Sequence, residues 1–373
     1  MKVPLLDIPA SYDKILVDIE KNIKQVIQSG QFILGPIVEE LEKKISTYCE
    51  TNFAIGVSSG TDALLISLMA AGIKEGDEVI TSPFTFFATA GCIARLGARP
   101  VFVDIEQDSF NINPNLIEKN ITNKTRAIIP VHLYGQSVNM DPVISLARKN
   151  NLVVIEDAAQ AIGSEYKGRR AGSMGDYGCF SFFPTKNLGG FGDGGMVTMS
   201  SEKIYNQVKA LRVHGSSLKY YHEVVGGNFR IDALQAGIVL AKLKYLDQWT
   251  EKRRHNAQTY NRLFKERGLK DQLRTPSEDF PRHVYNQYVV RIQKNRNELR
   301  SFLSENNIST EIYYPLPLHL QRCFASLGYK KGAFPESEKA ANETIALPIF
   351  PELTQSQITH VVDKIDLFFK EIR

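Results

Sequence analysis

The chain has 373 residues, with 45 Lys and Arg against 41 Asp and Glu, so its formal net charge is +4. Hydrophobic residues make up 43% and charged residues 23%, and a globular chain of this length can bury a large core. The near balance of charge argues against a dedicated nucleic-acid binder, which concentrates far more positive charge. The four cysteines lie far apart without a C-x-x-C pair, which argues against a disulfide scaffold and a zinc ribbon.

The sequence also lacks the patterns of membrane, secreted and metal-binding proteins. No apolar run approaches the ~18 residues that a membrane span needs. Residues 1–7 contain no long apolar stretch, so they do not resemble a secretory signal. The seven histidines are scattered without ligand spacing, and we therefore predict no metal site. We expect a cytoplasmic enzyme with no membrane or nucleic-acid partner.

The first two-thirds of the chain begin with an amphipathic helical pattern at 12–29 and then alternate apolar runs with helical patterns. The apolar runs lie at 53–57, 78–81, 101–103, 127–131, 152–155, 179–182 and 196–199. Helical patterns lie between several of them, at 62–71, 88–96 and 143–149. Apolar strands separated by helices predict a mainly parallel sheet covered on both faces. The run at 196–199 is the expected exception, because only a short loop joins it to the preceding strand.

The pattern changes after about residue 245. A long polar helix is predicted at 249–269, followed by a strand at 285–292, a helix at 298–305, a strand at 309–313 and a helix at 355–369. These elements form a smaller α+β unit. We therefore predict two domains, a large one over residues 1–245 and a small one over residues 246–373.

Ligands of an open parallel sheet bind beyond the carboxyl ends of its strands. Residues 58–62, Ser-Ser-Gly-Thr-Asp, follow the first strand and start a helix, where free backbone N–H groups can bind a phosphate. The same residue types are ordinary helix caps, so this segment alone does not decide. Phe84, Phe86 and Phe87 follow the second strand, and one of these rings could stack on a flat ligand although such aromatics usually lie in the core.

Two further strand ends carry charged residues. Asp157 follows an apolar strand, where an acid is costly to bury unless it has a partner such as a protonated ring nitrogen. A helix cap is an equal alternative. Lys186 lies between an aromatic strand and a glycine-rich loop, where a lysine can have a lowered pKa and form a Schiff base. A lone lysine is more often a surface residue, so this interpretation depends on the context.

The glycine-rich loop at 190–195 fits G-x-G-x-x-G but not the setting of a dinucleotide site. That motif follows a first strand, opens a helix and precedes an acid ~20 residues later. Here it leads into the extended run at 196–199, and the stretch 207–215 offers no acid. We therefore reject the interpretation of this loop as a dinucleotide fingerprint.

Five ordered segments, at 59–64, 84–86, 156–161, 181–186 and 226–236, carry a resemblance to a known family. Because of these five segments taken together, the chain resembles the DegT/DnrJ/EryC1/StrS family of pyridoxal-phosphate-dependent nucleotide-sugar aminotransferases. The resemblance extends from 4–7, Pro-Leu-Leu-Asp, to 347–348, Leu-Pro. It implies an α/β fold, the fold-type I arrangement of pyridoxal-phosphate-dependent transferases, with a mainly parallel central sheet, helices on both faces and a smaller C-terminal α+β domain.

The family pattern implies a role for each matching residue around the ring of pyridoxal 5'-phosphate. Lys186 would be the catalytic lysine, forming a Schiff base with the cofactor and later acting as general base. Asp157 would keep the pyridine nitrogen protonated, so that the ring serves as an electron sink. Gln160 would contact the ring hydroxyl, and Phe86 would stack on the ring face. Pyridoxamine 5'-phosphate would be the intermediate form of the cofactor.

The same pattern implies a phosphate site shared between two subunits. Gly60 and Thr61 would bind the phosphate through a helix N-terminus, with Ser181 joining them. Asn228 would reach the phosphate of the cofactor in the neighbouring subunit. The resemblance therefore implies a homodimer with active sites at the subunit interface.

The resemblance implies two substrates, an amino-acid donor and a nucleotide-linked ketosugar. L-Glutamate is the favoured donor. Arg230 would lie near the donor carboxylate or the sugar, with Tyr313 and Tyr314 also on the substrate side. Segments 186–189 and 192–195 resemble members that aminate the C3 ketone. UDP-3-keto-N-acetylhexosamines, the related uronates and dTDP-3-keto-6-deoxyhexoses all stay open, because 313–315 reads Tyr-Tyr-Pro where many C3 members have His-Tyr-Pro. The loops at 214–215 and 219–222 are expected at the site entrance, and polysaccharide or lipopolysaccharide synthesis is the expected setting.

Three alternatives stay open at this point. A C4-ketosugar aminotransferase would use the same residues. A pyridoxal-phosphate-dependent sugar dehydratase is less favoured, because family members of that kind replace the lysine with histidine and this chain keeps Lys186. A non-catalytic regulatory or DNA-binding protein is the third, although the chain offers no basic recognition helix.

Overall fold

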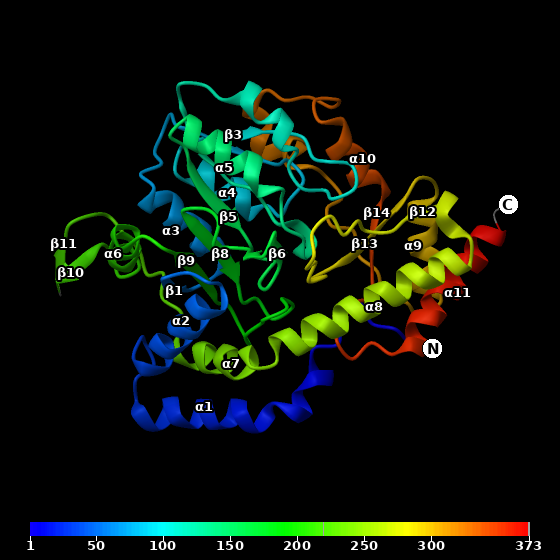
Figure 1. The fold of residues 1–373 in the computed structure, drawn as a ribbon, viewed down its shortest axis with the longest axis horizontal. Helices are drawn as coiled ribbons and strands as arrows, with labels where there is room; N and C mark the ends of the chain where they lie inside the picture. The colour runs from blue at the N-terminus through cyan, green and yellow to red at the C-terminus, as the bar shows by residue number, and fades with distance from the viewer. Residues whose placement is uncertain (219, 372–373) are drawn as a thin grey trace.

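The computed structural model describes residues 1–218 and 220–371. A seven-stranded sheet lies at its centre, in the order β1-β9-β8-β5-β4-β2-β3 (Figure 1). Its strands are β1 (Phe53–Val57), β2 (Glu78–Thr81), β3 (Arg99–Phe102), β4 (Thr125–Ile128), β5 (Val153–Asp157), β8 (Tyr177–Ser181) and β9 (Gly195–Met199). The pairs among β2, β3, β4, β5 and β8 are parallel, whereas β9 pairs antiparallel with both β1 and β8. The predicted mainly parallel sheet and its expected exception are both confirmed.

Helices cover both faces of this sheet. They are α2 (Pro36–Tyr48), α3 (Gly60–Ala70), α4 (Ala88–Arg95), α5 (Met140–Lys149), α6 (Glu202–Leu211) and α7 (Ala233–Leu243). Alternate strand residues point to opposite faces, so Cys179 packs with α3, α4 and α6 while Phe180 packs with α2 and α7. Helix α5 covers the second face over β4 and β5. Because both faces are buried, each strand reads as a continuous apolar run rather than an alternating one.

The N-terminal helix differs in its start from the sequence prediction. The turn η1 (Pro9–Lys14) comes first, and α1 (Leu16–Ser29) follows it. Ile19 of α1 packs with Ile238 of α7 and with Trp249. Helix α1 therefore forms an outer layer against α7, and the two helices run side by side at the bottom of Figure 1.

The C-terminal part builds a second core around a three-stranded antiparallel sheet. Its elements are α8 (Leu246–Glu266), β12 (Leu273–Arg274), β13 (Tyr288–Ile292), α9 (Arg296–Glu305), α10 (Pro335–Glu343), β14 (Thr344–Leu347) and α11 (Gln355–Glu371). Helices α8, α9 and α11 pack their apolar faces on this sheet. Val3, at the other end of the chain, lies in the same core, and its N–H donates to the carbonyl of Asn307 (2.9 Å).

The strand predicted at 309–313 does not form. Only an isolated bridge joins Glu311 to Ala346, because the next backbone groups of the ladder bond elsewhere. The N–H of Ser309 donates to the carbonyl of Val3 (2.9 Å), and the carbonyl of Tyr313 accepts from the Tyr134 hydroxyl. The remaining short elements are β6 (Glu165–Tyr166), β7 (Arg169–Arg170), β10 (Ser216–Leu218), β11 (Tyr221–His222), η2 (Pro114–Leu116), η3 (Glu118–Asn120), η4 (Leu133–Gly135), η5 (Leu269–Asp271), η6 (Leu318–Leu320) and η7 (Arg322–Leu327).

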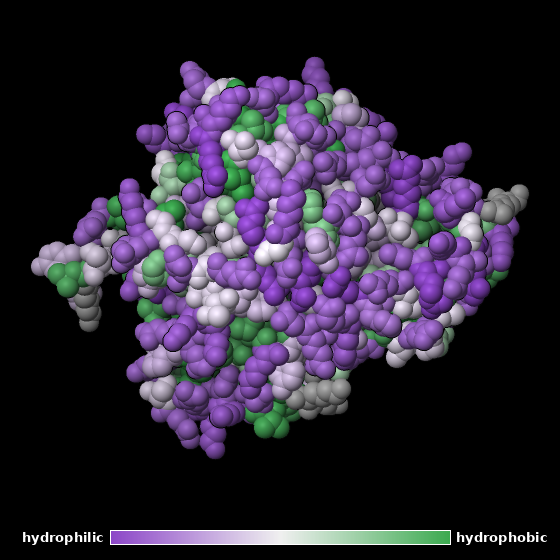
Figure 2. Space-filling view, viewed as in Figure 1, coloured by the Kyte–Doolittle hydropathy of each residue, from purple (hydrophilic) through white to green (hydrophobic). Residues whose placement is uncertain are grey.

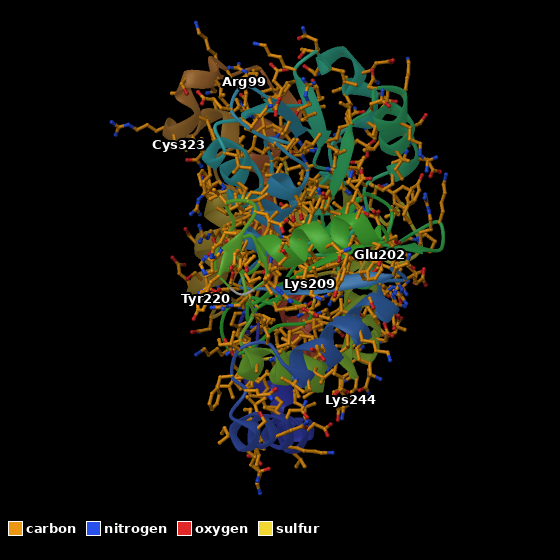
Figure 3. All side chains as sticks on the ribbon, turned by 90° about the vertical axis from the view of Figure 1, so that its left-hand side faces the viewer. Arg99, Glu202, Lys209, Tyr220, Lys244 and Cys323 are labelled. Atoms are coloured by element: carbon orange, nitrogen blue, oxygen red, sulfur yellow. The ribbon has the colours of Figure 1, made fainter. Side chains whose placement is uncertain are left out.

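The β10–β11 hairpin stands away from the body of the molecule. Figure 2 shows it projecting at one side with apolar residues near its tip, and Leu218, Tyr221 and Val225 are exposed by 64%, 69% and 89%. Seen from that side in Figure 3, Tyr220 marks the hairpin and Glu202 marks the neighbouring α6. Lys219, in the loop expected at the site entrance, lies outside the described residues.

The described residues contain neither a candidate membrane span nor a candidate metal cluster. No helix within residues 1–218 and 220–371 is long and apolar enough to cross a membrane. The same residues contain no group of three or more His, Cys, Asp or Glu side chains that could hold a metal ion.

The close approach of β8 to its neighbours yields a test of the core. A Cβ at Gly178 would overlap the backbone of Gly172 and the hydroxyl of Thr198, so we expect Gly178→Ala to lower the free energy of unfolding by about 1–3 kcal/mol. The matched control is Gly237→Ala in α7, where the new methyl would meet its nearest atom at 3.4 Å and helix propensity improves. Urea unfolding midpoints compare the two variants, and equal midpoints would contradict the packing described.

Candidate active site

Asp157 ends the central strand β5 and is 5% exposed. One carboxylate oxygen accepts a hydrogen bond from the Thr89 hydroxyl (2.8 Å) and the other from the Ala159 N–H (3.2 Å). Burial raises the pKa of Asp157, while these two hydrogen bonds and the charge of Lys186 oppose the rise. Among the described residues, no Lys, Arg or His forms an ion pair within 4 Å of this carboxylate. A buried acid held in place without a contacting cation suits a protonated nitrogen of a ligand.

Lys186 lies in the turn that follows β8, where its N–H donates to the carbonyl of Phe183 (2.9 Å). Its side chain is partly buried, and burial lowers its pKa to about 8 against an opposing effect of Asp157. The mutual influence on pKa shows that the two groups lie close together, as the sequence predicted for neighbouring strand ends. A lysine with this pKa is neutral, and hence nucleophilic, at a far lower pH than an exposed lysine.

The N-terminus of α3 lies against the end of β8. Ser59 caps the helix by accepting from the N–H of Asp62 (3.0 Å), which leaves the amides of Gly60 and Thr61 without intrahelical acceptors. A Cβ at Gly60 would stand 2.6 Å from the Cβ of Ser181, so glycine is required for this close approach. The structure thus brings Gly60, Thr61 and Ser181 together at a helix N-terminus, which is suited to an anion.

Gln160 connects the sheet edge with the aromatic residues predicted for the substrate side. Its Oε1 accepts from the N–H of Tyr134 (2.7 Å), and its Nε2 donates to the hydroxyl of Tyr314 (3.2 Å). The Tyr134 hydroxyl donates to the carbonyl of Tyr313. Burial raises the pKa of Tyr314, and the nearby charge of Asp157 adds to the rise, so Tyr314 lies at the same site. Phe86, 59% exposed, has its ring centroid 6.3 Å from that of Tyr314.

Asn228 and Arg230 form a separate pair. The Nε of Arg230 donates to Oδ1 of Asn228 (2.9 Å), and bridges join Asn228 to Val213 and Arg230 to Val57. Asn228 is exposed and Arg230 partly exposed. Within residues 1–218 and 220–371, no hydrogen bond or ion pair joins this pair to Asp157 or Lys186. The pair therefore lies near the carboxyl end of β1 but outside the cluster around Asp157.

A fully buried pair next to Asp157 was not recognised from the sequence. Glu156 Oε2 accepts from Nε2 of His132 and the N–H of Gly172 (both 2.8 Å), and Oε1 accepts from the N–H groups of Met174 (2.7 Å) and Gly175 (2.6 Å). Nδ1 of His132 accepts from the Val138 N–H (3.0 Å), so the ring proton lies on Nε2. Glu156 therefore fixes the backbone beside Asp157 rather than facing a ligand. The adjacent Glu-Asp pair is a sequence signal, but nothing local tells which acid faces inward.

Family comparison agrees with this geometry. The model of the DegT/DnrJ/EryC1/StrS aminotransferase family matches residues 13–366. The chain belongs to the DegT/DnrJ/EryC1/StrS aminotransferase family. It is 51% identical over 371 residues to a Geobacillus stearothermophilus protein named pleiotropic regulatory protein, covering 99% of each chain. It is 39% identical over 365 residues to the dTDP-3-amino-3,4,6-trideoxy-alpha-D-glucose transaminase of Streptomyces venezuelae, covering 98% of this chain and 95% of the relative.

Comparison with solved structures gives the same result. The crystal structure of S. venezuelae DesV in complex with a ketimine intermediate superposes with a TM-score of 0.93 at 39% identity, covering 98% of each chain. Members of the DegT/DnrJ/EryC1/StrS family with this fold are pyridoxal-phosphate-dependent, and the chain is an aminotransferase of nucleotide-linked sugars. The predicted family, fold type, cofactor and enzyme class are confirmed.

The role of Glu156 can be tested on stability. In Glu156→Gln the amide nitrogen cannot accept, so two of the four donors around it lose their partner. We expect the free energy of unfolding to fall by about 1–3 kcal/mol. Glu118→Gln is the matched control, because the Glu118 carboxylate is 61% exposed and pairs only with exposed Lys149, so its unfolding midpoint should not move. A Glu156→Gln variant as stable as the parent would show that these hydrogen bonds contribute little.

Proposed function

We propose that this aminotransferase transfers the amino group of an amino acid, L-glutamate in the first place, to the C3 ketone of a nucleotide-linked sugar. The main observation in support of this reaction is that half-buried Lys186 lies beside buried Asp157 and has a pKa lowered to about 8. The name of the S. venezuelae relative, a transaminase of a 3-amino sugar, supports the position of the amino group. The sequence at 186–195 supports it as well.

The residues of the site fit pyridoxal 5'-phosphate. Asp157 is a buried carboxylate without a contacting cation among the described side chains, which a pyridinium nitrogen would complete. Gly60 lies so close to Ser181 that no side chain fits at position 60, and the backbone N–H groups at the start of α3 would bind the phosphate there. Phe86 exposes its ring and so can cover a ring face.

When bound, the cofactor supplies an aldehyde and an electron sink. The chain supplies the proton transfers. Lys186 Nζ, neutral in a large fraction above pH 8, would take the proton from the α-carbon of the donor and pass it to the aldehyde carbon of the cofactor. With the sugar bound, it would move a proton from that carbon to the sugar carbon that accepts the amine. The hydrogen bonds from Thr89 and Ala159 favour the charged form of Asp157 against the effect of burial, and the charged carboxylate would hold a proton on the ring nitrogen. Gln160, fixed by Tyr134 and Tyr314, orients the ring.

We also propose a homodimer in which Asn228 and Arg230 complete the site of the partner subunit. Asn228 is exposed and makes no contact with its own Lys186 cluster in the described chain. Large apolar side chains around the site segments are also exposed, which is typical of a subunit interface. They include Phe32 (46%), Ile33 (51%), Phe183 (50%) and Phe191 (41%), and Ile33 pairs with Asp232 two residues beyond Arg230.

We also propose that the chain divides into two domains, residues 1–245 and residues 246–373. This division is supported by the start of α8 at Leu246 and by a three-stranded sheet with its own core. The packing of Val3 in that core means that the first residues would belong with the C-terminal domain.

The substrate position is tested by incubating the purified protein, loaded with pyridoxal phosphate, with glutamate and a panel of 3-keto and 4-keto nucleotide sugars. We expect an aminated product with a 3-keto sugar, detected by mass spectrometry, and none with Lys186→Ala because the proton-transferring amine is absent. Amination of 4-keto sugars alone would make the C4 alternative correct. Loss of a sugar hydroxyl would indicate a dehydratase. Turnover by Lys186→Ala at the parent rate would remove the lysine assignment.

A second variant addresses the subunit contact. Asn228→Ala should raise the dissociation constant of the cofactor about tenfold, because a hydrogen bond to a charged phosphate is lost. Retention of the cofactor during dialysis gives the measurement. Asn342→Ala, which removes an exposed asparagine of α10, is the matched control. Unchanged retention in Asn228→Ala would count against a cross-subunit phosphate contact.

A further inference from the structure

Two buried asparagines face each other where the Lys186 turn meets the segment before β13. Asn187 and Asn286 are 8% and 7% exposed. Nδ2 of Asn286 donates to Oδ1 of Asn187 (3.0 Å), and Nδ2 of Asn187 donates to the carbonyl of Val284 (2.9 Å). Because a backbone carbonyl can only accept, the second bond fixes the orientation of both amides. Asn187 is thereby held through both ends of its side chain.

The fixed orientation leaves Oδ1 of Asn286 without a hydrogen-bond partner among the described residues. Asn286 borders a cavity of about 90 Å³ that Thr185 and Tyr313 also line. The Asn286 side-chain amide is therefore bonded only on the side that faces Asn187.

The other side of this segment is fixed by the turn at Tyr134 and Gly135. The N–H of Val284 donates to the carbonyl of Gly135, and the N–H of Asn286 donates to the carbonyl of Tyr134 (both 2.9 Å). Gly135 has a φ of +103°, and a Cβ there would meet Val284 Cγ2 at 2.8 Å and the Asn286 nitrogen at 3.1 Å. The turn at Gly135 and the segment 284–286 therefore pack closely, and one can shift little along the other.

The same turn holds two residues of the site. The N–H of Tyr134 donates to Gln160, and its hydroxyl donates to the carbonyl of Tyr313. A continuous chain of hydrogen bonds thus runs from Gln160 and Tyr313 through Tyr134 to Asn286, and from Asn286 to Asn187, the neighbour of Lys186. These residues come from five separate segments of the sequence.

We propose that Asn187 and Asn286 are positioning residues that set the depth of Lys186 relative to Gln160 and Tyr313. The inference rests on the proposed role of Lys186 as the reacting lysine. Without the pair, the turn at 184–188 loses its anchor to the segment 284–287, and the Lys186 amine becomes more hydrated. Reaction rates depend steeply on such placement, and a shift of ~1 Å can cost up to about 100-fold.

The test measures the ionisation of Lys186 in the cofactor-free protein. Asn187→Leu and Asn286→Leu remove the amides at similar side-chain size. Labelling by an amine-reactive reagent across pH, with mass spectrometry of the Lys186 peptide, gives the midpoint. From a parent value of about 8, set by burial, we expect each variant to shift upward by about one unit towards an exposed lysine. The double variant should shift no further than the single ones, because both act through one contact.

The matched control is Asn256→Leu. Asn256 is also buried (6% exposed) and donates to a backbone carbonyl, that of Phe350 (2.9 Å), but among the described residues no hydrogen bond joins its side chain to the turn at 184–188. It should lose stability without moving the Lys186 midpoint. In the cofactor-loaded enzyme, Asn187→Leu should lower kcat about tenfold with little change in the KM of the sugar nucleotide.

The Lys186 midpoint tests the proposal only in variants that fold. If the Leu variants do not fold, Asn187→Ser and Asn286→Ser, whose hydroxyls are too short to span the contact, receive the same measurement. Midpoints equal to the parent value in folded variants of both asparagines would overturn the proposal. That result leaves the role of Lys186 itself intact, since the loss of amination in Lys186→Ala tests that role separately.

Discussion

The burial of one carboxylate at the end of the central strand is the constraint on which the site depends. Removing Asp157 from water disfavours its charge, and the structure offsets this only in part, with the Thr89 hydroxyl, the Ala159 N–H and the nearby charge of Lys186. Lys186 is affected in the opposite sense, because the same burial disfavours its ammonium form. A site that lacks a contacting cation for its acid, and has a lysine that readily loses its proton, is prepared for a cationic ring and an aldehyde.

The surroundings of this acid are rigid for identifiable reasons. Glu156, the preceding residue, accepts four hydrogen bonds, and three of them come from the backbone of residues 172–175. Strand β9, the antiparallel member of the sheet, places Gly195 against Ser59, so the N-terminus of α3 lies close to β8. The antiparallel strand β9 therefore also fixes where the N-terminus of α3 lies, in addition to joining β1 to β8.

The sequence predicted what local patterns determine. Strands buried on both faces read as apolar runs, and Asp157 and Lys186 stood out because each interrupts such a setting. The strand expected at 309–313 failed because two remote residues, Val3 and Tyr134, bond to the backbone of Ser309 and Tyr313, and residue preferences do not reveal such partners. Thr89, Tyr134 and the Asn187–Asn286 contact were missed because their partners are remote. The last contact joins positions 99 residues apart, and only the folded chain brings them together.

The place of Val3 in the C-terminal core affects how this chain acquires its structure. Its backbone bonds to Asn307 and Ser309, and its side chain is fully buried beside residues of β13, α9 and α11. Val3 thus finds its partners only after α9, Asn307, Ser309 and α11 have been made. Domains generally fold as units, N-terminal ones first, as the chain emerges. In this protein the central sheet can form early, whereas the C-terminal core closes only after α11 has been made.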